Sequence, residues 1–136
     1  MLAICVTESK YISPIASKKS YMAFMPAVVL AAGIAVLSLT EASQMPSVQV
    51  NDKLVHALMY ALLSASLMGA WVYTRRTRVL YYIGACVGAT AYGALMELLQ
   101  TCCTLTRSGD GMDILADFAG ALVGVLIMVF YHPYKQ

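Results

Sequence analysis

Four long stretches of apolar residues, separated by short polar segments, dominate the pattern along the chain. They cover residues 21–39, 53–73, 79–99 and 111–131, and the few charged residues within them lie close to one end of a stretch. A helix needs about 20 apolar residues to cross a bilayer core about 30 Å thick. The pattern therefore predicts four transmembrane helices, with connecting segments too short to form a soluble domain.

The composition strengthens this prediction. Apolar residues make up 60% of the 136 residues and charged residues 12%, whereas soluble domains average about 45–50% and about 25%. Disordered, collagen-like and soluble globular proteins are therefore excluded, and the net charge of +2 is too small to indicate binding to nucleic acid. None of the four cysteines lies in a CxxC pair, so no zinc-knuckle or thiol redox motif is found. We predict an all-α, polytopic membrane domain over residues 21–136, a bundle of four helices with the lipid bilayer as its main partner.

The basic residues predict the orientation in the membrane. Seven of the nine lie before the first stretch, between the second and third, or after the fourth: Lys10, Lys18, Lys19, Arg75, Arg76, Arg78 and Lys135. In a bundle of four helices these regions share one side, and Lys and Arg gather on the cytoplasmic side. We therefore expect both termini in the cytoplasm, with residues 1–20 forming a poorly ordered cytoplasmic segment.

The ionisable residues inside the four stretches all fall at the outer level. His56 lies in the first turns of the second stretch, and Glu97 lies near the end of the third, three residues before Gln100. Asp113 and Asp117 lie in the first turns of the fourth stretch. Because successive helices run in opposite directions, all five residues are predicted to lie near the same boundary. Carboxylates within a membrane are costly and generally face the bundle interior with a partner, so we expect one shared polar cluster.

The spacing within each helix supports a shared cluster. Asp52, His56 and Tyr60 follow one another at intervals of four residues, which places them on one face of a helix. Asp113 and Asp117 are separated by the same interval. The two faces are therefore expected to point toward each other.

Two basic residues, Lys53 and Arg107, lie on the outer side, against the general charge rule. Both have acidic residues close by in the sequence, and we expect local ion pairs to explain their position. Asp110 stands where the fourth helix should begin, so it fits an N-cap, and Asp113 would complement the positive helix end. An alternative for the whole cluster is a salt-bridge clasp that only holds helices together, although buried ion pairs are poor stabilisers.

Two glycine pairs, Gly84–Gly88 and Gly120–Gly124, form GxxxG motifs. Such motifs let helix backbones approach closely in lipid. They predict that the third and fourth helices are close neighbours.

Together, these motifs resemble the VanZ-like family of small bacterial membrane proteins. The resemblance rests on Asp52-Lys53-x-x-His56-x-x-x-Tyr60, on Glu97-x-x-Gln100, and on the segment that runs from Arg107 through Asp110 and Asp113 to Gly120. It covers residues 22–131. The family usually has Asn at the position of Asp117, so this chain carries an additional carboxylate.

The resemblance implies a role in the bacterial cell envelope and a location in the cytoplasmic (inner) membrane. The family is named for a protein linked to low-level resistance to the glycopeptide teicoplanin. The resemblance does not supply a reaction.

Three functional hypotheses use the polar cluster. In the first, it binds or transforms an amphipathic envelope component, such as a lipid-linked phosphate or glycan precursor. In the second, the protein is a non-enzymatic accessory that alters envelope composition or glycopeptide access through partners. The third is a proton or ion relay, although relays generally place acids nearer the membrane midplane. No serine-nucleophile, P-loop or HExxH motif indicates an enzyme.

The candidate residues divide into two sets. The candidate acid–base residues are His56, Glu97, Asp113 and Asp117, and the same four are candidate ligands for a divalent cation. The candidate ligand-binding residues are Lys53, Gln100, Arg107 and Asp110, of which Lys53 and Arg107 would hold an anionic head group.

Overall fold

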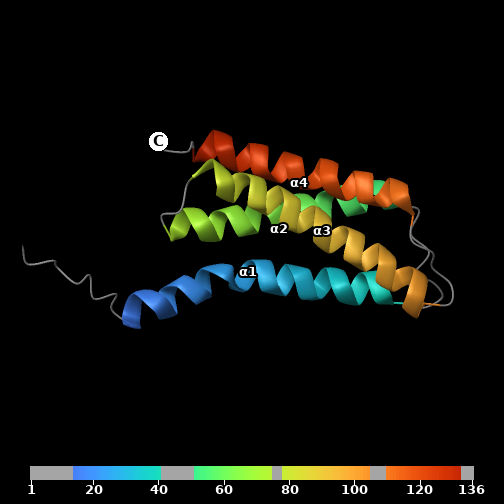
Figure 1. Cartoon of the computed structure of the whole chain (residues 1–136), viewed down its shortest axis with the longest axis horizontal. Helices are drawn as coiled ribbons and strands as arrows, with labels where there is room; N and C mark the ends of the chain where they lie inside the picture. The colour runs from blue at the N-terminus through green and yellow to red at the C-terminus, as the bar shows by residue number, and fades with distance from the viewer. Residues whose placement is uncertain (1–13, 41–50, 75–77, 105–109, 133–136) are drawn as a thin grey trace, which may run out of the picture.

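The protein is a bundle of four helices that run side by side and alternate in direction (Figure 1). The structure, a computed structural model, describes residues 14–40, 51–74, 78–104 and 110–132. Within these ranges the chain forms α1 (Pro14–Leu39), α2 (Asp52–Tyr73), α3 (Val79–Cys103) and α4 (Gly111–Tyr131), and no strand. The prediction of an all-α bundle of four helices is confirmed.

Each helix is long and apolar enough to cross a membrane. Two boundaries differ from the prediction. Helix α3 continues to Cys103, beyond the predicted end at residue 99. Helix α1 begins at Pro14, and its apolar part covers Ser20–Leu39. Residues 14–20 therefore belong to α1, residues 1–13 lie outside the described residues, and the poor order expected for residues 1–20 stays a prediction.

The outer surface of the bundle is apolar. Large apolar side chains on different helices point outward, with exposed fractions of 67% for Val36, 73% for Leu80 and 85% for Phe130. The buried positions include carboxylates, an imidazole and an amide. A surface of this kind suits hydrocarbon rather than water, so the prediction of a lipid bilayer environment is supported.

Helices α2 and α4 approach most closely, because small residues face each other along their contact. A side chain at Gly120 would overlap the backbone of Ala57, and one at Gly124 would overlap Ala61 and Ser64. The two glycines therefore set the distance between α2 and α4.

The GxxxG motifs predicted that the third and fourth helices are close neighbours. Helices α3 and α4 do contact each other, but the glycines of α4 face α2 instead. On α3, a side chain at Gly84 would make ordinary contact with Trp71 at 3.5 Å, and one at Gly88 would meet none of the described residues within 4 Å. The predicted neighbourhood of the third and fourth helices is therefore confirmed, whereas the close approach at the α4 glycines is to α2, which presents Ala57 and Ala61 there.

Helix α1 is attached to α3 by two hydrogen bonds from side chains to its backbone. The hydroxyl of Tyr92 donates to the carbonyl of Ala31 at 2.7 Å, and the amide of Gln100 donates to the carbonyl of Ser38 at 3.0 Å.

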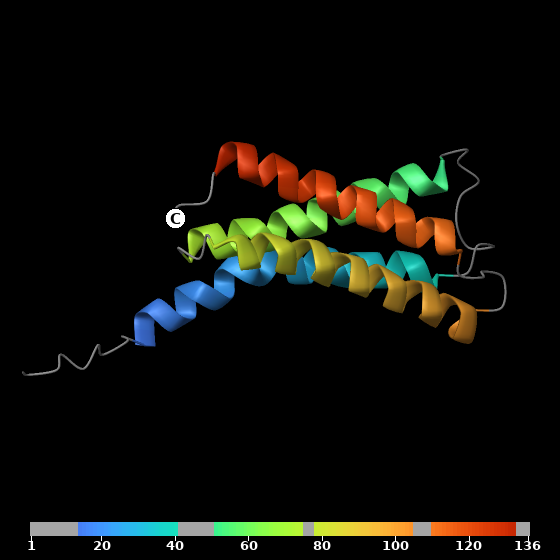
Figure 2. The same ribbon diagram turned by 45° about the horizontal axis from the view of Figure 1, so that its top comes forward.

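The alternation of the helices brings distant parts of the chain together at one end. Helices α2 and α4 begin where α1 and α3 end (Figures 1 and 2). We call this the polar end, because the ionisable residues of the three later helices lie there.

Candidate functional site

Three helices each contribute one ionisable side chain to a cluster inside the polar end. Nδ1 of His56, on α2, lies 2.9 Å from Oδ1 of Asp117 on α4 and 4.0 Å from Oε1 of Glu97 on α3. The exposed fraction is 5% for His56, 0% for Asp117 and 4% for Glu97. We call His56, Glu97 and Asp117 the buried triad.

A glycine on α3 makes room for this arrangement. A side chain at Gly93 would overlap the carboxyl group of Asp117. Gly93 lies four residues before Glu97, so both occupy one face of α3. Sequence reasoning missed Gly93, although its interval from Glu97 was a signal that could have found it.

Outside the buried triad, a second layer of charged residues surrounds Lys53. Nζ of Lys53 lies 3.1 Å from Oδ2 of Asp110 and 3.0 Å from Oδ1 of Asp113. Lys53 and Asp110 are half-exposed, whereas Asp113 is buried. Lys53 thus forms the local ion pairs that the sequence indicated.

Asp110 connects the two layers. Its side chain caps α4 by accepting a hydrogen bond from the backbone N–H of Met112 at 2.9 Å, as predicted. Its own backbone N–H donates to Oε2 of Glu97 at 2.9 Å. The hydrogen bond from Met112, together with the ammonium of Lys53, lowers the pKa of the Asp110 carboxyl below its ordinary value. Asp110 is therefore a carboxylate at neutral pH.

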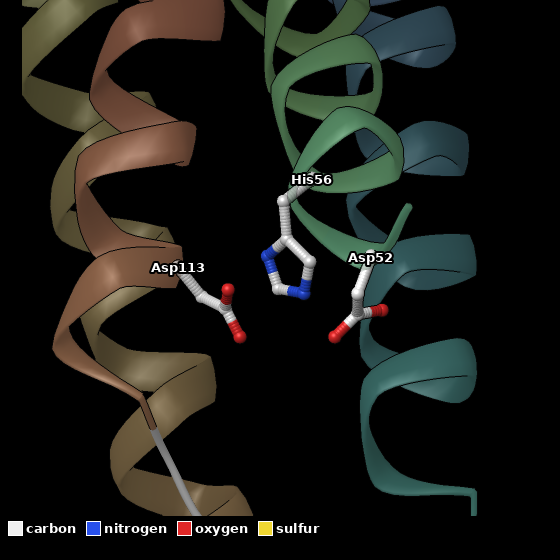
Figure 3. Close-up of side chains that lie close together, drawn as sticks. All are labelled: Asp52, His56 and Asp113. Carbon is white, nitrogen blue, oxygen red and sulfur yellow. The ribbon is translucent and has the colours of Figure 1, made fainter. Parts of the chain in front are cut away.

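The imidazole of His56 belongs to both layers. Figure 3 shows it between the carboxyl groups of Asp52 and Asp113. Donor atoms of these three residues lie within 4.8 Å of one another, and the same is true of the buried triad. The ring of Tyr60 stacks on His56, with 6.3 Å between ring centroids. His56 therefore links the buried carboxylates to those nearer the end of the bundle.

Three buried oxygens in this region have no hydrogen-bond partner among the described residues. They are Oε1 of Glu97, Oδ2 of Asp117 and the hydroxyl of Tyr60. A buried polar atom without a partner costs about 1–3 kcal/mol, and more when it is charged. A hydrogen-bond donor or a cation beside the two carboxylate oxygens would remove this cost.

One predicted site residue of the described structure, Gln100, contacts α1 rather than the other cluster residues. The amide nitrogen of Gln100 donates a hydrogen bond to the carbonyl of Ser38, which links α3 to α1. Its ligand-binding role stays a prediction. Arg107 lies outside the described residues.

The cluster carries more negative than positive groups. Its described members are five carboxyl groups against one ammonium and one imidazole: Asp52, Glu97, Asp110, Asp113, Asp117, Lys53 and His56. Lys53 already contacts two of the carboxylates. An acid excess of this kind favours ligands with hydroxyl, amine or cationic groups over a bare anion.

Comparisons with protein-family models, curated proteins and solved structures found no match. The resemblance to the VanZ-like family therefore stays a hypothesis based on the motifs.

Proposed function

We propose that this chain is a VanZ-like multi-pass protein of the bacterial cytoplasmic membrane whose polar end binds the head group of an amphipathic envelope component. A lipid-linked glycan precursor is the ligand class that fits best. The observation that carries the proposal is the buried triad, which combines three ionisable groups from three helices with unpartnered carboxylate oxygens.

A structural clasp would not need this arrangement. A carboxylate within a bilayer costs about 2.5–3.5 kcal/mol on insertion scales, and a clasp offsets this cost only when each charge is paired. Asp117 is fully buried, yet one of its oxygens and one of Glu97 lack a hydrogen-bond partner in the described chain. Such oxygens accept hydrogen bonds from the hydroxyl and amine groups of a glycan.

The location suits an amphipathic ligand. The apolar tail of a lipid can lie along the apolar surface of the helices while its head group reaches Lys53 and Asp113 at the polar end. The positive-inside rule orients this end outward and both termini inward. In this orientation the site faces the compartment in which glycopeptides act on the envelope, in keeping with the resistance linked to the family.

The second candidate is an enzyme that acts on a lipid-linked phosphate or glycan precursor. The contact between His56 and Asp117 favours it, because a carboxylate on one ring nitrogen orients an imidazole for proton transfer. Glu97, at 4.0 Å from the same ring, would be the second acid–base group.

Glu97→Gln tests the proposal. The glutamine oxygen can still accept the hydrogen bond from the backbone of Asp110, so shape is kept while the charge is removed. Thr90→Val is the matched control, because Thr90 lies on the same helix and donates within it to Cys86. Each protein is purified in native nanodiscs, and its bound lipids are measured by mass spectrometry.

We expect a lipid-linked precursor with the wild type and Thr90→Val, and at least a tenfold loss with Glu97→Gln at equal protein abundance. Equal retention of that lipid by Glu97→Gln, or no enrichment in the wild type, contradicts the proposal. Loss of Glu97→Gln protein from the membrane, with Thr90→Val still abundant, supports the clasp instead.

A further inference from the structure

We infer that the buried triad binds one divalent transition-metal ion between Nδ1 of His56, Oε1 of Glu97 and the carboxylate of Asp117. The inference rests on the proposed function, because it concerns the same site. It adds the class of ion that binds there and the atoms that hold the ion.

The distances between the donor atoms suit such an ion. In the tetrahedral site that zinc prefers, bonds of about 2.0–2.2 Å separate the donor atoms by about 3.3–3.6 Å. Nδ1 of His56 lies 2.9 Å from Asp117 and 4.0 Å from Glu97, and the donors of all three residues lie within 4.8 Å. The two distances from Nδ1 lie on either side of this separation, so an ion can replace the hydrogen bond between His56 and Asp117 after small rotations of the three side chains.

The unpartnered oxygens provide a second, independent reason. Oε2 of Glu97 is held by the backbone N–H of Asp110, whereas Oε1 has no hydrogen-bond partner in the described chain. A hydrogen bond to the outer oxygen fixes the carboxylate so that the other oxygen faces the site, as in many metal centres. Oδ2 of Asp117 is buried and equally without a partner there.

The charges balance with a divalent ion. A neutral imidazole and two carboxylates carry a charge of −2, which one divalent ion cancels. A single proton on His56 cancels only one of the two negative charges. Because an uncompensated buried charge is costly, the site is electrostatically suited to a divalent ion.

The donor set selects the class of metal. One imidazole nitrogen and two carboxylate groups suit Zn²⁺ or Mn²⁺, whereas Ca²⁺ takes six to eight oxygens. Three protein ligands also leave at least one position open for water or a polar group of the lipid.

The second group of possible donors, Asp52, His56 and Asp113, is a weaker competitor. Asp52 is exposed, and the ammonium of Lys53 lies 3.0 Å from Asp113. That positive charge repels a cation. We therefore assign the ion to the buried triad.

Metal binding is measured on the full chain in detergent, without added lipid. Cys102 and Cys103 are exposed, so both are replaced by serine to prevent binding of zinc to thiolates. Zn²⁺ is titrated calorimetrically, and bound metal is counted by mass spectrometry after desalting. Asp117→Asn and Glu97→Gln keep the shape of the site, whereas Asp52→Asn and Thr90→Val are controls outside the buried triad.

We expect one Zn²⁺ per chain in the background protein and both controls, and at least a tenfold weaker affinity in Asp117→Asn and Glu97→Gln. Circular dichroism before metal addition establishes that each variant is folded. Absence of Zn²⁺ binding by the folded background protein overturns the inference, as does unchanged affinity in Asp117→Asn. If Asp52→Asn loses Zn²⁺ binding while Asp117→Asn and Glu97→Gln keep it, the ion belongs to the second group of donors and the inference is wrong. Lipid retention and metal binding are measured in separate experiments. The proposed function can therefore be contradicted while metal binding is confirmed, and metal binding can be contradicted while lipid retention is confirmed.

Discussion

Replacing Gly120 with alanine tests whether the close contact between α2 and α4 holds the site together. The added carbon would lie 2.6 Å from the carbonyl carbon of Ala57 and 2.7 Å from its Cα. Ordinary contact begins at 3.4 Å, so the nearer of these two atoms would be 0.8 Å too close. Since the obstacle is backbone rather than a flexible side chain, α4 has to move away from α2. His56 and Asp117 lie on these two helices, so the movement also lengthens their contact of 2.9 Å.

The expected cost follows from a comparison with Gly88→Ala. Both substitutions gain helix propensity, about 1 kcal/mol for Gly to Ala in water, and this gain cancels between them. At Gly88 the new carbon meets no atom of the described part of the chain within 4 Å. Overpacking of a tight contact costs about 1–3 kcal/mol. Gly120→Ala should therefore have a lower free energy of unfolding than Gly88→Ala by about 1–3 kcal/mol.

The assay is reversible unfolding of each variant in detergent micelles by titration with SDS, followed by far-UV circular dichroism. Gly124→Ala serves as a second test, since its added carbon would overlap Ala61 and Ser64. Equal free energies of unfolding for Gly120→Ala and Gly88→Ala would refute the reasoning, because they would mean that α2 and α4 do not approach as closely as described.

Two further predictions concern orientation and pH. In a cysteine-free background, Ser47→Cys should react with an impermeant label in intact cells and Arg76→Cys only after permeabilisation; the opposite pattern would reverse the predicted orientation. Because the pKa of Asp110 is lowered in the folded protein, its charge contributes stability above the ordinary carboxyl value of 3.8, and that stability is lost as pH falls through the lower folded value. Asp110→Asn, which keeps a capping oxygen for Met112 but loses the ion pair with Lys53, should be less stable than wild type at neutral pH and nearly equal to it in strong acid. A stability difference that does not change with pH in SDS unfolding would contradict this role.

The sequence predicted the helices and the level of the site along them. The lengths of the apolar stretches determine how many helices cross a bilayer, and the alternating direction places His56, Glu97 and Asp117 at one end. Both inferences need only the geometry of single helices.

The lateral neighbours of each residue could not be predicted in this way. Gly120 faces α2 rather than α3, and Gln100 faces α1 rather than the cluster. Gly93 is needed because Asp117 occupies the space beside it. Such contacts depend on how side chains from several helices fill one space together, which the periodicity of one helix does not determine.

The attachment of α1 has a consequence for how the sequence of this protein can change. Both hydrogen bonds from α3, donated by Tyr92 and Gln100, end on backbone carbonyls of α1. Every amino acid supplies the same carbonyl, so lipid-facing substitutions on α1 leave both attachments intact. The membrane-facing positions of α1 can therefore drift freely among apolar residues over evolutionary time, whereas the two donors on α3 are constrained.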